Sequence, residues 1–183
     1  FLGQIQNSEN YIFDYDPKRN KIDIHGGAEQ NIITIRLPWI MPHLDKFDPC
    51  KLKDIQNIKH QIILVQAGYA AIGRFEGGQL IDHKLIRKYM VRKKQGKAQI
   101  SYLHSKGKSR AGSRIRLSQT VQFFEEINQY INLWIRDTEP DRLLLSCTPR
   151  LWGLMFQSRV KPEFEKKDHR IFKIPVDVKI PNT

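Results

Sequence analysis

The stretch QIILVQAGYAAIGRFEGGQLIDHKLI, residues 61–86, decides the fold. Residues 61–66 form a nearly continuous apolar run, as is typical of a buried β-strand. Residues 67–76 form a second run, which is rich in small residues, and residues 79–86 form a third. Gly77 and Gly78 separate the last two runs, and two glycines can occupy turn positions that need positive φ. The sequence therefore predicts three strands, with a tight hairpin at the glycines.

The flanking regions extend this pattern into an α/β fold. Apolar residues spaced by three or four predict a long helix over 115–135, with Ile115, Leu117 and Val121 at the start of the stripe. Residues 141–147 read as another buried strand. Residues 148–157 suit a helix that begins near Pro149. Residues 171–180 read as a final strand, which Pro175 makes either an edge strand or a bulged one. We expect an α/β fold with a mixed sheet, flanking helices and a long basic loop between the third strand and the long helix.

The N-terminal third is less informative. Residues 31–36 alternate in the manner of a short strand, residues 37–48 read as an irregular connection, and residues 51–59 suggest a weak helix or a turn. We therefore divide the chain into an N-terminal extension, 1–60, and a domain over 61–183.

Composition narrows the class of protein. The chain has 183 residues, of which 40% are apolar, so it can bury one ordinary core. No apolar run approaches membrane-spanning length, and no secretory signal is visible at the start. Cys50 and Cys147 lie far apart without metal-ligand spacing, so we expect two reduced thiols, a cytoplasmic protein, and no metal or cofactor.

Charge is the most informative property. The net charge is +12, and the segment 83–124 contains twelve basic residues and no acidic ones. The remaining 19 basic residues are matched by the 19 acidic residues of the chain, so this one segment carries the whole excess. A solvated face normally mixes signs, so an unmixed basic segment favours a nucleic-acid partner. The candidate RNA-binding residues are Lys84, Arg87, Lys88, Arg92, Lys93, Lys94, Lys97, Lys106, Lys108, Arg110, Arg114 and Arg116.

Two glutamines are candidates for a catalytic residue. Gln79 completes a literal Gly-Gly-Gln, the signature of factors that release peptides from peptidyl-tRNA, but the tight turn explains these letters fully. Gln99 ends a looser motif, Gly96-Lys97-Ala98-Gln99, within the long basic loop. An amide does not titrate near neutral pH, but it can orient a water molecule, and a backbone N–H can stabilise an oxyanion. His104 is an alternative base for RNA cleavage by a neighbouring 2′-hydroxyl.

The segments HKLIRKYMVRKKQGKAQISY (83–102) and GKSRAGSRIRLSQ (107–119) resemble the Vms-like release-factor family. The resemblance runs from residue 62 to the C-terminus and is strongest over 83–116. It rests on a set of positions rather than on any single motif, and the chain departs from the commoner Gly-Gly start of the motif in having Lys97. The matching positions are His83, Lys84, Arg87, Tyr89, Arg92, Lys94, Gly96, Gln99, Gly107, Lys108, Ala111, Gly112 and Arg116, followed by Lys173-Ile174-Pro175 and Pro181-Asn182-Thr183.

This resemblance implies a core similar to RNase H and to the middle domain of the eukaryotic termination factor. It implies action on peptidyl-tRNA and rRNA in the large ribosomal subunit, with Gln99 as catalytic residue and Gly96 as its loop glycine. Two reactions are compatible with this reading, hydrolysis of the peptidyl ester and cleavage of the tRNA near its 3′ end. The rival interpretation is a non-catalytic module that binds rRNA or tRNA. We expect a monomer in either case.

Overall fold

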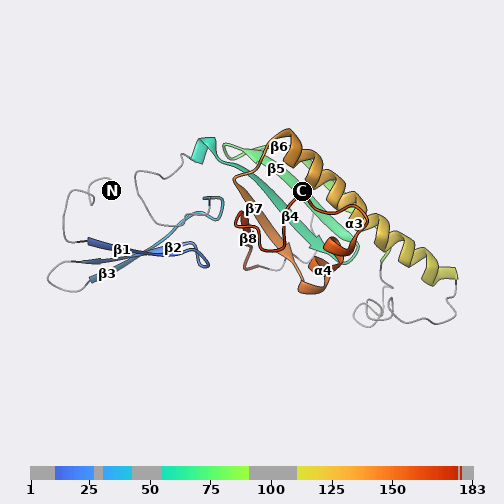
Figure 1. Cartoon of the computed structure of the whole chain (residues 1–183), viewed down its shortest axis with the longest axis horizontal. Helices are drawn as coiled ribbons and strands as arrows, with labels where there is room; N and C mark the ends of the chain where they lie inside the picture. Colours follow the sequence, from blue (N-terminus) through green and yellow to red (C-terminus); the bar gives the residue numbers. More distant parts are fainter. Residues whose placement is uncertain (1–10, 27–30, 43–54, 91–110, 177, 179–183) are drawn as a thin grey trace.

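The computed structural model describes residues 11–26, 31–42, 55–90, 111–176 and 178. They form two sheets and two α-helices (Figure 1). The first sheet is antiparallel and has the order β1-β2-β3. Its strands are β1 Tyr11–Asp16, β2 Lys21–Gly26 and β3 Asn31–Arg36. A short 3₁₀ helix, η2 Ile55–Asn57, precedes the second sheet.

The second sheet has five strands in the order β6-β5-β4-β7-β8. Strands β4 (Lys59–Gln66), β5 (Tyr69–Glu76) and β6 (Gln79–Arg87) pair antiparallel. Strands β7 (Arg142–Cys147) and β8 (Ile171–Lys173) add to β4 in parallel. Helix α3 (Ala111–Asp137) connects β6 to β7, and α4 (Pro149–Gln157) lies in the crossover from β7 to β8. The mixed sheet and the α/β class are therefore confirmed.

The glycine hairpin is confirmed as well. Gly77 and Gly78 both have positive φ, 55° and 79°, and Glu76 pairs with Gln79 across the turn. The N–H of Gly77 donates to the carbonyl of Ile58 at 3.1 Å, which ties the turn to the chain beside η2. Gln79 is thus the exposed first residue of β6.

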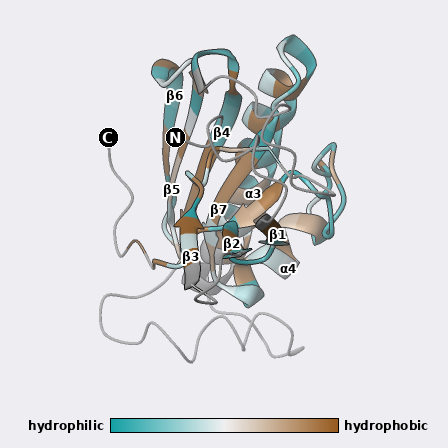
Figure 2. Ribbon diagram, turned by 90° about the vertical axis from the view of Figure 1, so that its left-hand side faces the viewer, coloured by the Kyte–Doolittle hydropathy of each residue, from teal (hydrophilic) through white to brown (hydrophobic). Residues whose placement is uncertain are grey.

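The main core lies between the five-stranded sheet and the two helices. Alternate residues of the central strands, such as Ile63 and Leu145, join Ile127 of α3 and Met155 of α4 in one buried cluster. Both helices therefore cover the same face of the sheet. Figure 2 shows the hydrophobic colouring concentrated on the strands of this sheet. A smaller cluster around Ile22 and Ile24 stabilises the three-stranded sheet.

Asn128 and Asn132 fix α3 against the chain that follows α4. The Asn128 amide donates to the carbonyls of Met155 at 2.8 Å and Val160 at 2.6 Å. Asn132 donates to the carbonyl of Lys161 at 2.7 Å. Because these amides are buried, each bond also satisfies a polar group that would otherwise destabilise the core.

Three expectations need correction. Strands β1 and β2 were not expected, and with β3 they form a three-stranded sheet within the N-terminal extension. The last strand is shorter than expected and stops at Lys173, two residues before Pro175, but it does occupy the sheet edge. The apolar stripe of α3 is buried only from Phe123 onward, whereas Ile115 and Leu117 are exposed, because the first turns of the helix extend beyond the sheet (Figure 1).

Candidate nucleic-acid interface

The predicted catalytic segment, residues 91–110, connects β6 to α3. The chain leaves β6 at Arg87 and returns at Ala111, the first residue of α3. Met90 is buried in the main core, so this end of the segment begins from a fixed point. Residues 91–110 lie outside the described residues. So do the predicted site residues Gln99, Gly96, Arg92, Lys93, Lys94, Lys97, Lys106, Lys108 and Arg110.

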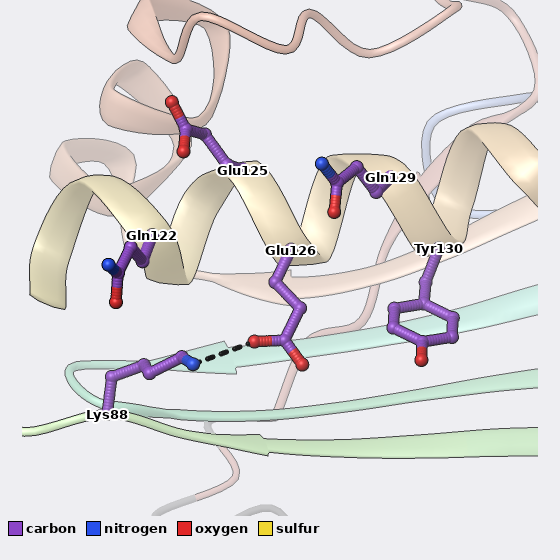
Figure 3. Close-up of a pocket in the computed structure, with 6 residues that line it drawn as sticks. All are labelled: Lys88, Gln122, Glu125, Glu126, Gln129 and Tyr130. Carbon is purple, nitrogen blue, oxygen red and sulfur yellow. Dashed lines mark ion pairs between the residues drawn. The ribbon is translucent and has the colours of Figure 1, made fainter.

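Lys84 and Lys88 are partly neutralised by Glu126 on α3. The Lys88 ammonium lies 3.0 Å from the Glu126 carboxylate (Figure 3). The Lys84 ammonium lies 4.0 Å from the same carboxylate. Lys84 also lies 4.6 Å from the centre of the Tyr130 ring, and interaction with Tyr130, reinforced by Glu126, raises the pKa of Lys84. These two cations thus anchor β6 to α3, so they are less available to a polyanion than the sequence suggested.

Lys88, Glu126 and Tyr130 also line an open groove of about 370 Å³ beside α3. Figure 3 shows Glu125, Glu126, Gln122 and Gln129 projecting from α3 around this groove. The two carboxylates make this groove unsuited to phosphate, in contrast to the basic segment that begins beside it.

Three further predicted cations flank the segment, Arg87 before it and Arg114 and Arg116 after it. Arg87 is exposed and pairs in register with Tyr69 of β5. Tyr69 and Tyr89 are 40% and 54% exposed, and Tyr89 follows Arg87 by two residues. Arg114 and Arg116 belong to the first turns of α3. The structure therefore places Arg87 opposite Tyr69 in the sheet, close in sequence to the start of the segment.

Sequence reasoning missed the role of Glu126. The basic segment 83–124, which contains no acidic residue, ends only two residues before Glu126. Helical spacing in 115–135 would place residues 126 and 130 on one face, because residues four apart are neighbours. Nothing in the sequence showed that this face would meet β6, since that contact joins residues about forty positions apart.

Other kinds of site find little support in the described part of the chain. There, no three His, Cys, Asp or Glu side chains converge as metal ligands would, and no helix there is both long and apolar enough to span a bilayer. Cys147 is a free thiol, and burial raises its pKa to about 12, which keeps it protonated. Cys50 lies outside the described residues.

Comparison with curated proteins finds distant relatives. The mouse (Mus musculus) protein tRNA endonuclease ANKZF1 is 23% identical over 136 residues, which cover 71% of this chain and 18% of the relative. The human (Homo sapiens) protein of the same name is 24% identical over 149 residues, which cover 76% of this chain and 20% of the relative. The chain thus spans about a fifth of the length of the curated relatives it matches.

A family model described as "Bacteroidetes VLRF1 release factor" matches residues 60–183. The match begins within β4 and contains the rest of the five-stranded sheet, both helices and the segment 91–110. It covers more than half of the chain, and it confirms the resemblance to Vms-like release factors. The chain therefore belongs to the Bacteroidetes VLRF1 release factor family.

Proposed function

We propose that this protein releases nascent peptides from peptidyl-tRNA on stalled large ribosomal subunits. The observation that carries the proposal is the family match over 60–183, which includes the basic segment and its Gly96-to-Gln99 motif. The name tRNA endonuclease on the two mammalian relatives supports cleavage of the tRNA near its 3′ end as one route. Hydrolysis of the peptidyl ester is the other.

In this proposal residues 91–110 form a catalytic loop. The segment contributes seven cations and no acid, so it suits a cavity walled by RNA. The Gln99 amide orients the attacking water or the ribose hydroxyl, and its backbone N–H stabilises the developing oxyanion. Gly96 provides the backbone freedom that such a loop needs. RNA is bound where the loop leaves the domain by Arg87, and where the loop rejoins it by Arg114 and Arg116.

The proposal extends to the wider architecture. Residues 61–183 form the release-factor-like domain, with an arrangement like that of RNase H and of the termination-factor middle domain, and residues 1–60 form an extension. The protein acts in the cytoplasm as a monomer, and its partners are rRNA, peptidyl-tRNA and the large subunit. Chemistry by an amide and by RNA groups needs no metal or cofactor.

The test is peptide release from isolated large subunits that carry peptidyl-tRNA. Gln99→Ala is expected to bind the subunits as the wild type does and to release no peptide. Gln79→Ala is the matched control, because it removes the same amide from the hairpin, and it is expected to release at the wild-type rate. Sequencing the tRNA 3′ end after the reaction distinguishes the two routes, since only cleavage leaves a shortened tRNA.

If the Gln99→Ala variant released peptide at the wild-type rate, the catalytic role proposed for the Gly96-to-Gln99 motif would be wrong. Subunit binding without release by the wild-type protein would instead favour a non-catalytic binding module. In that case charge reversal at Lys93 and Lys94 would abolish binding, whereas Gln99→Ala would change nothing.

A further inference from the structure

A second basic surface lies far from the segment 91–110 in the sequence. It is a pocket of about 460 Å³ formed where β3 and the following chain meet the edge strand β8. We call it the β3–β8 pocket. Most of its lining residues precede residue 60 and so lie outside the family match. Its lining includes five cations, Lys18, Arg19, Lys21, Arg36 and Lys173.

Two nearby carboxylates neutralise only part of this charge. Asp23 binds the Lys21 ammonium at 2.5 Å and accepts a hydrogen bond from Thr34 at 2.6 Å, and these bonds lower the pKa of Asp23. Asp16 faces Arg19 at 3.8 Å. Lys18, Arg36 and Lys173 form no ion pair with any described residue. The pocket therefore keeps an excess of positive charge.

The pocket also presents an aromatic platform. Trp39 is 42% exposed, and its ring stacks on Phe172 of β8 with 6.1 Å between centroids and 28° between planes. The Arg142 guanidinium lies 5.2 Å from the centre of the Phe172 ring. Its N–H groups donate to the carbonyls of Trp39 at 3.4 Å and His169 at 3.3 Å, so it fixes the backbone that carries the indole.

Arg142 adds to the positive field. It is only 1% exposed, and no carboxylate pairs with it among the described residues. Burial lowers its pKa, but a guanidinium remains protonated in proteins. A buried cation without an anion is unfavourable by itself, and an anionic ligand beside it would relieve that cost.

We propose that the β3–β8 pocket binds single-stranded RNA. One base stacks on Trp39, and the flanking phosphates contact Lys18, Arg36 and Lys173. Cations beside an exposed aromatic ring are the usual means of binding single strands. An acidic peptide would use the cations but not the ring. The proposal is independent of the proposed function, because neither Gln99 nor the segment 91–110 takes part in it.

The experiment uses the full chain and a labelled oligouridine of about ten nucleotides with one photoreactive 5-iodouridine. Cross-linking followed by mass spectrometry locates the base, and fluorescence anisotropy at several salt concentrations measures affinity. We expect a cross-link to the peptide that contains Trp39. Trp39→Ala is expected to weaken binding about fivefold or more, because one stacked base is lost.

Lys18→Gln combined with Arg36→Gln is expected to reduce the slope of log affinity against log salt by about 1.4, for two phosphate contacts. Both side chains are exposed, so this variant leaves the core intact. Arg150→Gln combined with Lys167→Gln is the matched control. It removes the same charge at exposed positions outside the pocket and is expected to leave the slope within the error of the wild type.

The proposal would be overturned if the Lys18/Arg36 variant and the Arg150/Lys167 variant showed the same slope of log affinity against log salt. A cross-link confined to residues 83–117 would overturn it as well. Displacement of the RNA by polyglutamate, with no cross-link at Trp39, would assign the pocket to an acidic peptide instead. Gln99→Ala is expected to bind the oligonucleotide as the wild type does. Loss of release in that variant together with retained cross-linking would separate the two sites.

Discussion

The hairpin at Gly77 and Gly78 allows two neighbouring glycines to be compared by the same substitution. Both have positive φ, a region that costs an alanine about 1–2 kcal/mol. A Cβ added at Gly78 would meet no atom within 4 Å. A Cβ added at Gly77 would lie 2.6 Å from the backbone oxygen of Gln56, so either the turn or η2 would have to move. Overpacking of this kind costs about 1–3 kcal/mol more.

We therefore expect Gly78→Ala to lower the free energy of unfolding by about 1–2 kcal/mol and Gly77→Ala by about 2–5 kcal/mol. An extra 2 kcal/mol corresponds to a Tm lower by about 4–8 °C in a domain of this size. Thermal and urea unfolding followed by circular dichroism measure both variants. Equal losses, or a milder loss at Gly77, would refute the reasoning from the Gln56 contact.

Two further predictions concern charge. Glu126→Gln is expected to free the two lysines that it pairs with, so that the salt dependence of RNA binding becomes steeper by about 0.7 per lysine. The expected stability cost is about 1 kcal/mol or less. Glu165→Gln removes the same charge from an exposed position away from these lysines and is the control. Burial lowers the pKa of His60 from 6.5, so the unfolded chain takes up a proton that the folded chain does not, and stability is expected to fall as the pH drops below about 6.5. His60→Phe keeps a ring against Phe75 and is expected to show a smaller fall in Tm between pH 7.5 and 5.5 in matched thermal scans; an equal fall would contradict this assignment.

Local signals predicted the five-stranded sheet well. The apolar run of β4, the two glycines and Pro149 each act through neighbouring residues, so the sequence displays their effect directly. Strands β1 and β2 were missed because their stabilisation is not local. Ile22 and Ile24 are the fully buried side chains of β2, and they pack against Leu37, Met41 and Ile58 from later in the chain.

The candidate site was predicted less completely. The excess charge of 83–124 was readable from the sequence, but its partial neutralisation by Glu126 depends on how α3 lies against β6. Periodicity showed that α3 is amphipathic, but it could not show where along the helix the sheet ends. The roles of Gln99 and Gly96 remain predictions. The β3–β8 pocket joins residues more than 130 positions apart, and no sequence pattern indicated it.

The overhang of α3 has a mechanical consequence. Asn128 and Asn132 hold the C-terminal half of the helix, and the segment 91–110 is joined to its first residue, Ala111. An α-helix turns by about 100° and rises about 1.5 Å with each residue. Inserting one residue into the overhang would swing the attachment point a quarter turn around the axis, whereas inserting seven would restore its direction and carry it about 10 Å outward. The length of the overhang and its rotation about the helix axis thus set where the segment joins the domain.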